Sequence, residues 1–219
     1  MTKIRYLGHA AFEISSDKII VYIDPFLENS PIKVSEIKKA DFILISHDHF
    51  DHVGAAEEIA NATDATVIST PEVSNDLNVK NKLSMNMGSM IEPVNGFKVA
   101  MVQAIHTSGK GTPVGYVTEV GNVTIYHGGD TALYGDMSLI KKLYNPKIAL
   151  LPIGGHYVMG PKEAAVALTL IEPEIVIPMH YKTFPVLEQD AQKFIMQAEK
   201  IAPSVKVKII EPGDSLIYP

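Results

Sequence analysis

The sequence contains no cysteine among its 219 residues. Disulfides, a thiolate nucleophile and cysteine-ligated zinc are therefore excluded. Any metal site has to be built from imidazole and carboxylate groups. The chain offers 8 histidines and 25 acidic residues for that purpose.

Dense basic clusters and long apolar runs are also missing. The formal net charge is -6, whereas a protein that binds nucleic acid needs a basic footprint, so we expect a small-molecule substrate and no nucleic acid. No apolar run approaches the roughly 20 residues that span a bilayer, and no basic amphipathic segment suggests membrane binding. Since the first residues show no secretory signal, the expected compartment is the cytoplasm.

No proline-, glycine- or serine-rich linker divides the chain. Its length suits one generous domain with a sizeable core, so residues 1–219 are predicted to form a single domain. Homo-oligomers are common among soluble enzymes, and we expect one here, although the sequence shows no interface.

The apolar pattern predicts an α/β protein. In the first half it indicates an antiparallel meander and one buried strand, followed by a helix and a hairpin around Gly121-Asn122. In the second half helices alternate with strands, which is typical of α/β layering with the helices outside. The expected strands are 3–7, 11–15, 19–23, 42–46, 65–69, 97–104, 115–120, 123–126, 148–153, 175–179 and 205–210. The expected helices are 53–61, one from residue 71, 136–143, 162–171 and 188–201.

Four of the expected strands run into loops that carry histidine or aspartate. In α/β sheets, ligands collect beyond the strand ends, where loops from several strands converge. A metal site assembled at one sheet edge is therefore expected. The strands are 42–46, 97–104, 123–126 and 175–179.

Residues 47–52 read His-Asp-His-Phe-Asp-His and follow a buried strand. In an extended turn His47 and His49 point the same way, so they can share one ion. Asp51 and His52 lie where the chain turns into a helix and can face a neighbouring ion. Such ligands suit zinc, iron, manganese or nickel, and a metal-bound water loses its proton near neutral pH. A histidine-rich surface turn is the alternative.

This motif resembles the hallmark of the metallo-β-lactamase superfamily, and the resemblance continues along nearly the whole chain. It implies that His106 completes the first metal site, that Asp130 bridges two metals and that His180 completes the second. Asp51 would also shuttle a proton. The implied fold is α/β (α+β), a four-layer αβ/βα sandwich. The implied ligands are His47, His49 and His106 for one ion, and Asp51, His52 and His180 for the other, with Asp130 and a hydroxide between them.

Segments 8–12, 23–26 and 152–156 look like a branch of metal-dependent hydrolases. That branch is similar to L-ascorbate-6-phosphate lactonase and, more distantly, to N-acyl phosphatidylethanolamine phospholipase D. The resemblance implies hydrolysis of an ester or lactone, with a phosphodiester as the next choice. The expected cofactors are two divalent ions, with zinc ahead of manganese, nickel or iron.

Four further residues are candidates for the site. His156 follows two glycines on a loop, where it would bind substrate or donate a proton as a catalytic residue. His9 would contact substrate or support a ligand, or else be a structural histidine. Asp24 would orient a ligand imidazole, or cap a turn. Tyr181 would donate a hydrogen bond to a polarised oxygen, or pack against the sheet.

Two other functions stay open. One is an iron-dependent redox enzyme of the same fold. His49 disfavours it, because some flavin-linked relatives have glutamate at that position. His52 and His180 also disfavour it, because single-iron relatives normally lack the histidine of the second metal site. The other is a protein that binds metal or a metabolite without turnover. That function is disfavoured because every ligand implied by the resemblance is present.

Overall fold

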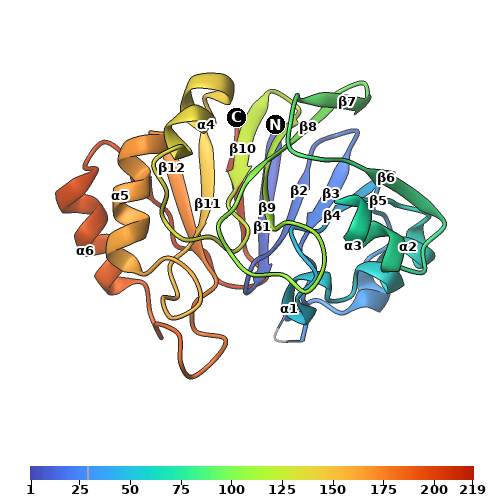
Figure 1. Ribbon diagram of the computed structural model, residues 1–219, viewed down its shortest axis with the longest axis horizontal. Helices are drawn as coiled ribbons and strands as arrows, with labels where there is room; N and C mark the ends of the chain where they lie inside the picture. Colours follow the sequence, from blue (N-terminus) through green and yellow to red (C-terminus); the bar gives the residue numbers. More distant parts are fainter. Residues whose placement is uncertain (29) are drawn as a thin grey trace.

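Two sheets pack face to face in the computed structural model, which describes residues 1–28 and 30–219. Within these residues each sheet has seven strands. Figure 1 places the two sheets side by side in the centre of the molecule, with helices on both flanks.

The first sheet has the order β14-β1-β2-β3-β4-β5-β6. Its first four strands pair antiparallel and the rest pair parallel. The predicted meander is confirmed as β1 to β3. The strands are β1 (Thr2–Gly8), β2 (Ala11–Ser15), β3 (Ile20–Ile23), β4 (Phe42–Leu44), β5 (Thr66–Ser69), β6 (Asn81–Ser84) and β14 (Ser215–Tyr218).

The second sheet has the order β13-β12-β11-β10-β9-β8-β7. It repeats the arrangement of the first, with antiparallel pairing from β7 to β10 and parallel pairing from β10 to β13. The strands are β7 (Ile91–Val94), β8 (Phe97–Gln103), β9 (Val114–Val120), β10 (Val123–His127), β11 (Ile148–Pro152), β12 (Ile175–Met179) and β13 (Lys206–Val207).

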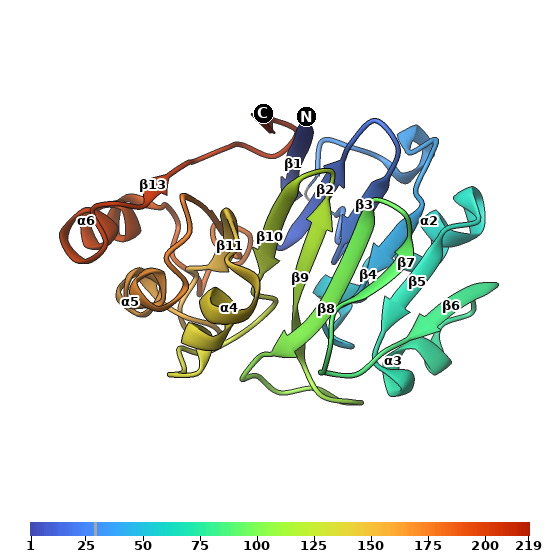
Figure 2. The same ribbon diagram turned by 90° about the horizontal axis from the view of Figure 1, so that it is seen from above.

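Helices cross between the parallel strands, since parallel neighbours cannot be joined by a tight turn. Helices α4, α5 and α6 cover the outer face of the second sheet, and α2 and α3 that of the first (Figure 2). A short 3-10 helix spans Val34–Glu36. The α-helices are α1 (Phe50–Val53), α2 (Ala56–Thr63), α3 (Pro71–Asp76), α4 (Met137–Tyr144), α5 (Pro161–Ile171) and α6 (Gln192–Ile201).

Three apolar clusters separate four structural layers. The largest lies between the sheets and includes Phe12 from one sheet and Phe97 from the other. A second joins α4, α5 and α6 to their sheet through residues such as Phe194. The third joins α2 and α3 to the first sheet through Ile59 and Val73. The predicted four-layer αβ/βα sandwich is therefore confirmed.

Several element boundaries differ from the prediction. The helix expected at 53–61 is α2, which begins at Ala56, and only Val53 of that range belongs to α1, because Gly54 has φ +46° and ψ -126°, which no helix accommodates. The helix expected from residue 188 begins at Gln192. The strand expected at 205–210 pairs only over Lys206–Val207. Strands β6 and β14 lie on sheet edges and were not predicted, because partial exposure on both faces leaves little apolar alternation.

Within the described ranges, 1–28 and 30–219, we find no helix with the length and apolar character needed to cross a bilayer.

Candidate metal centre

The seven predicted ligand residues lie beyond strand ends of both sheets. Helix α1, labelled in Figure 1, contributes two of them directly after the His47–His49 turn. Their positions are His47 and His49 after β4, Asp51 and His52 in α1, His106 after β8, Asp130 after β10 and His180 after β12.

A first group consists of three imidazoles. Nε2 of His47 lies 2.9 Å from Nδ1 of His49, and the ring of His106 lies 5.1 Å and 5.2 Å from the other two rings. One nitrogen atom from each residue lies within 4.8 Å of the others. Three imidazoles at this spacing can hold one ion.

Asp130 joins this group to a second one. Its Oδ2 lies 3.5 Å from Nε2 of His106 and 3.1 Å from Nε2 of His180, and its Oδ1 lies 3.3 Å from Nε2 of His52. The carboxylate is buried. One carboxylate therefore faces imidazoles of both predicted metal sites.

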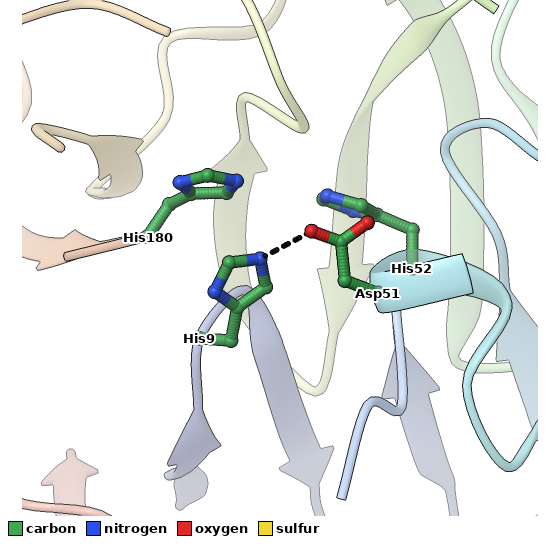
Figure 3. A group of neighbouring side chains, drawn as sticks. All are labelled: His9, Asp51, His52 and His180. Atoms are coloured by element: carbon green, nitrogen blue, oxygen red, sulfur yellow. Dashed lines mark hydrogen bonds and ion pairs between the residues drawn. The ribbon is translucent and has the colours of Figure 1, made fainter. Parts of the chain in front are cut away.

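The second group contains His9, Asp51, His52 and His180, whose ligand atoms also lie within 4.8 Å of one another. Figure 3 shows these four side chains converging from three separate parts of the chain. Nε2 of His9 lies 3.1 Å from Oδ2 of Asp51, and the rings of His9 and His180 lie 4.0 Å apart. The structure thus places His9 beside the three ligands that the sequence predicted.

Unpaired buried atoms show that a metal fits these residues. Nε2 of His52 and Oδ1 of Asp130 are buried and make no hydrogen bond within the described part of the chain, although they lie 3.3 Å apart. Buried polar atoms are normally satisfied. Imidazole nitrogens and carboxylate oxygens are the donors that first-row divalent ions accept, and a cation among them would satisfy both atoms.

Electrostatics also favours a cation. Burial lowers the pKa of His47 to about 3 and also lowers the pKa of His106, so both are neutral, the form that binds metal. Burial opposes the charge of Asp130, yet the imidazoles of His52 and His180 hold its pKa well below the ordinary value. Burial likewise opposes a proton on His52, but Asp130 and Asp24 raise its pKa. The buried carboxylates therefore draw positive charge into the centre.

A cavity of about 540 Å³ is lined by several of the predicted ligands. We call it the central cavity. Its size suits a small molecule, and within the described residues no lysine or arginine lines it. Its lining consists of His49, Phe50, Asp51, His106, Thr107, Asp130, Tyr157, His180, Phe184, Pro185 and Val186.

Comparison with known proteins identifies the family. A model described as a beta-lactamase superfamily domain matches residues 3–180. A UPF0173 metal-dependent hydrolase of Caldivirga maquilingensis is 47% identical over 225 residues, covering 100% of this chain and 99% of the relative. One from Staphylothermus marinus is 46% identical and covers 100% of both chains. The chain belongs to the UPF0173 metal-dependent hydrolases of the metallo-β-lactamase superfamily.

A solved structure supports the same conclusion. Igni18, a metallo hydrolase from Ignicoccus hospitalis, superposes with a TM-score of 0.92 at 36% identity, covering 98% of this chain and 97% of that one. Of the three functions left open by the sequence, membership of the UPF0173 hydrolases supports hydrolysis. The closer likeness to L-ascorbate-6-phosphate lactonase stays a prediction.

Asp24 orients two of the predicted ligands of this UPF0173 protein through hydrogen bonds. Its Oδ1 accepts the backbone N–H of Ser46 at 2.7 Å, and its Oδ2 accepts both Nδ1–H of His52 at 2.8 Å and Oγ–H of Ser46 at 2.7 Å. Because the hydroxyl of Ser46 donates to Asp24, it accepts from Nδ1 of His47, 2.9 Å away. One buried carboxylate therefore keeps the proton on Nδ1 of His47 and His52 and leaves Nε2 of both free for metal.

Replacing Asp24 by asparagine is expected to weaken metal binding about ten- to hundredfold. The amide can donate to Nδ1 of His52, which would move the imidazole proton to Nε2, the atom that faces Asp130. Competition with a chromogenic chelator measures the affinity. Asp41→Asn is the control. Asp41 also accepts a hydrogen bond from a backbone N–H, that of Ile20 at 2.8 Å, but it belongs to neither ligand group. Equal affinity in the Asp24 variant and the control would contradict this role.

Three residues of this centre have strained backbone conformations. His9, Asp24 and His180 have φ of +53°, +45° and +56°, a region that residues with a Cβ seldom adopt. Such conformations cost about 1–3 kcal/mol each and persist where function requires them. Here they direct His9 and His180 into the second group and Asp24 towards His52.

The predicted residues His156 and Tyr181 lie outside the lining of the central cavity. His156 is exposed and lines a neighbouring cavity with Leu187 and Glu188, so its proton-donating role stays a prediction. Tyr181 is buried and packs in the cluster between α5, α6 and the second sheet. Of the two roles open for Tyr181, this placement favours packing.

Sequence reasoning missed Ser46, Thr183 and the apolar residues of the central cavity. Ser46 immediately precedes the histidine motif, but its link to Asp24 spans 22 positions. Thr183 Oγ1 lies 2.7 Å from Nδ1 of His9, across 174 positions. No local pattern signals contacts over such distances.

Proposed function

We propose that the protein hydrolyses an ester or lactone bond of a small molecule at a centre of two divalent ions, with zinc as the expected metal. A phosphodiester is the second choice. The observation that carries the proposal is Asp130, whose carboxylate faces His106 of the first group and His52 and His180 of the second. In this proposal His47, His49 and His106 hold one ion, and Asp51, His52 and His180 the other.

Two bound metal ions would supply a hydroxide nucleophile at neutral pH and polarise the bond under attack. The protein's own contribution is to keep its ligands in the correct protonation state. Asp24 and Ser46 do this for His47 and His52.

Asp51 is the residue placed to move a proton. Burial opposes its charge, but the hydrogen bond from His9 and the nearby imidazoles lower its pKa to about 2. Burial lowers the pKa of His9 to about 4, so His9 is neutral and donates through Nε2 to Oδ2 of Asp51. Its Nδ1 then accepts from the hydroxyl of Thr183. Thus oriented, Asp51 can take a proton from the attacking water and return it to the leaving group.

Metal removal tests the proposal. Dialysis against a chelator is expected to lower hydrolysis of simple aryl esters and lactones at least about a hundredfold, since the metals supply several kcal/mol of transition-state stabilisation. Addition of Zn²⁺ should restore activity and bring metal content to two ions per chain, measured by mass spectrometry. The melting temperature should fall on chelation, because a ligand of the native state stabilises it. Full activity in the metal-free protein, or restoration at one ion per chain, would contradict the two-metal centre.

A further inference from the structure

The opening of the central cavity is lined by apolar side chains, which we call the apolar rim: Phe50, Tyr157, Phe184, Pro185 and Val186. Phe50 is 67% exposed, Tyr157 58% and Val186 54%. They come from α1, from the loop after β11 and from the loop after β12. Large apolar groups gathered at one opening mark a binding surface.

The apolar rim is held in position before any ligand arrives. The rings of Phe50 and Phe184 lie 6.4 Å apart, and Phe184 also packs edge-on against His9 at 5.4 Å. The loop that carries Phe184 is closed by hydrogen bonds from Leu187 N to Phe184 O at 3.1 Å and from Glu188 N to Gly154 O at 2.9 Å. A preorganised surface loses little entropy on binding.

Among the described residues, the apolar rim offers no cationic partner for a negative charge. Lys182 of the same loop lies 3.6 Å from Glu211, and Lys193 of α6 lies 2.9 Å from Glu188. Each of these lysines lines a different cavity. An anionic group remote from the reacting bond would thus be desolvated without a counter-charge, which is costly.

We infer that the substrate carries an uncharged apolar group, such as an aryl or branched alkyl group, beside the bond that is cleaved, and that Phe184 and Val186 select it. This inference rests on the proposed hydrolytic function. It predicts that a phosphorylated sugar lactone is a poor substrate, because its phosphate would lie against the apolar rim.

Binding is measured first, independently of turnover. The probes are 5-phenylpyrrolidin-2-one, a neutral lactam, and its para-sulfonate, because a sulfonate is a weak metal ligand. With the zinc-loaded protein, ligand-observed saturation-transfer NMR should show the neutral lactam binding at least about tenfold more tightly, with saturation strongest on its ring protons. Equal or tighter binding of the sulfonate would overturn the inference.

Substitutions then test the selecting residues with the corresponding pair of lactones. Phe184→Ala should raise KM for the neutral lactone about tenfold with little change in kcat, as expected for lost apolar contact. Val186→Lys should lower the ratio of kcat/KM for the neutral over the sulfonated lactone at least about tenfold, because the added cation pairs with the sulfonate. Val94→Lys is the control, since Val94 is 42% exposed and lies outside the lining of the central cavity.

The possible results distinguish failure of the inference from failure of the proposed hydrolytic function. Lactone turnover without preference for the neutral member, or an equal ratio in Val186→Lys and Val94→Lys, overturns the inference and leaves hydrolysis standing. Selective binding of the neutral lactam without turnover of any ester or lactone supports the apolar preference and overturns the proposed reaction.

Discussion

Replacing Asp130 by alanine is expected to lower kcat/KM about a thousandfold, the upper range for removal of one preorganised charge-stabilising group, and to reduce the metal content below two ions per chain. The reason is geometric. Asp130 is the carboxylate that faces His106 from the first group and His52 and His180 from the second. Without it, the centre loses the carboxylate that faces both groups and offsets the mutual repulsion of two cations. Steady-state kinetics and metal analysis of the purified variant measure the two effects.

Two further variants separate charge from folding. Asp130→Asn keeps the size of the side chain and removes its charge, so it should lose activity nearly as far as the alanine variant. Asp136→Ala is the matched control: Asp136 is exposed at the start of α4 and its side chain makes no capping hydrogen bond there. It should retain metal and activity. Unchanged turnover in Asp130→Ala would refute the placement of this carboxylate between two metals.

Replacing Gly54 by alanine is expected to destabilise the protein by about 3 kcal/mol, from backbone strain of about 1–3 kcal/mol and overpacking of about 1–3 kcal/mol. Gly54 has φ +46° and ψ -126°, and a Cβ there would lie 2.7 Å from the backbone N and Cα of Phe26. Neither the backbone at Gly54 nor the backbone at Phe26 can move away without displacing α1 or the chain that follows Asp24. Thermal unfolding should show a fall of about 2–4 °C per kcal/mol for a chain of this size.

A second glycine isolates the steric part of this effect. Gly96 also has a positive φ, +91°, but a Cβ there would meet no atom within 4 Å. Gly96→Ala should therefore cost only the backbone strain, about 1 kcal/mol, and leave metal affinity unchanged. The Gly54 variant should lose metal affinity as well, because α1 carries Asp51 and His52. Equal melting temperatures for the two variants would show that the junction between α1 and α2 tolerates a Cβ.

The meander and the α/β layering with helices outside could be predicted because they depend on local patterns, whereas the four-layer order was implied by the family resemblance. The meander at β1 to β3 and the helix–strand alternation after β10 follow from apolar periodicity within short windows, and the structure confirms both. The edge strands β6 and β14 could not be predicted, since their pairing is with β5 and β1 and their own sequences show no alternation. Gly54 likewise separates α1 from α2 where the chain meets a distant segment, since the next residue, Ala55, donates its backbone N–H to Pro25 O at 2.9 Å.

At the site, the sequence by itself determined which side chains could bind metal. His47, His49, Asp51 and His52 are close in sequence, and the family resemblance supplied His106, Asp130 and His180. Only the tertiary structure decided how Asp24 and Ser46 orient the imidazoles, that His156 lies outside the central cavity and that an apolar rim surrounds its opening. The physical reason is the sequence separation over which each feature is determined. The identity of possible ligands follows from residue type and short spacing in the sequence. Hydrogen-bond direction and cavity shape depend on atoms that meet only after distant segments have packed.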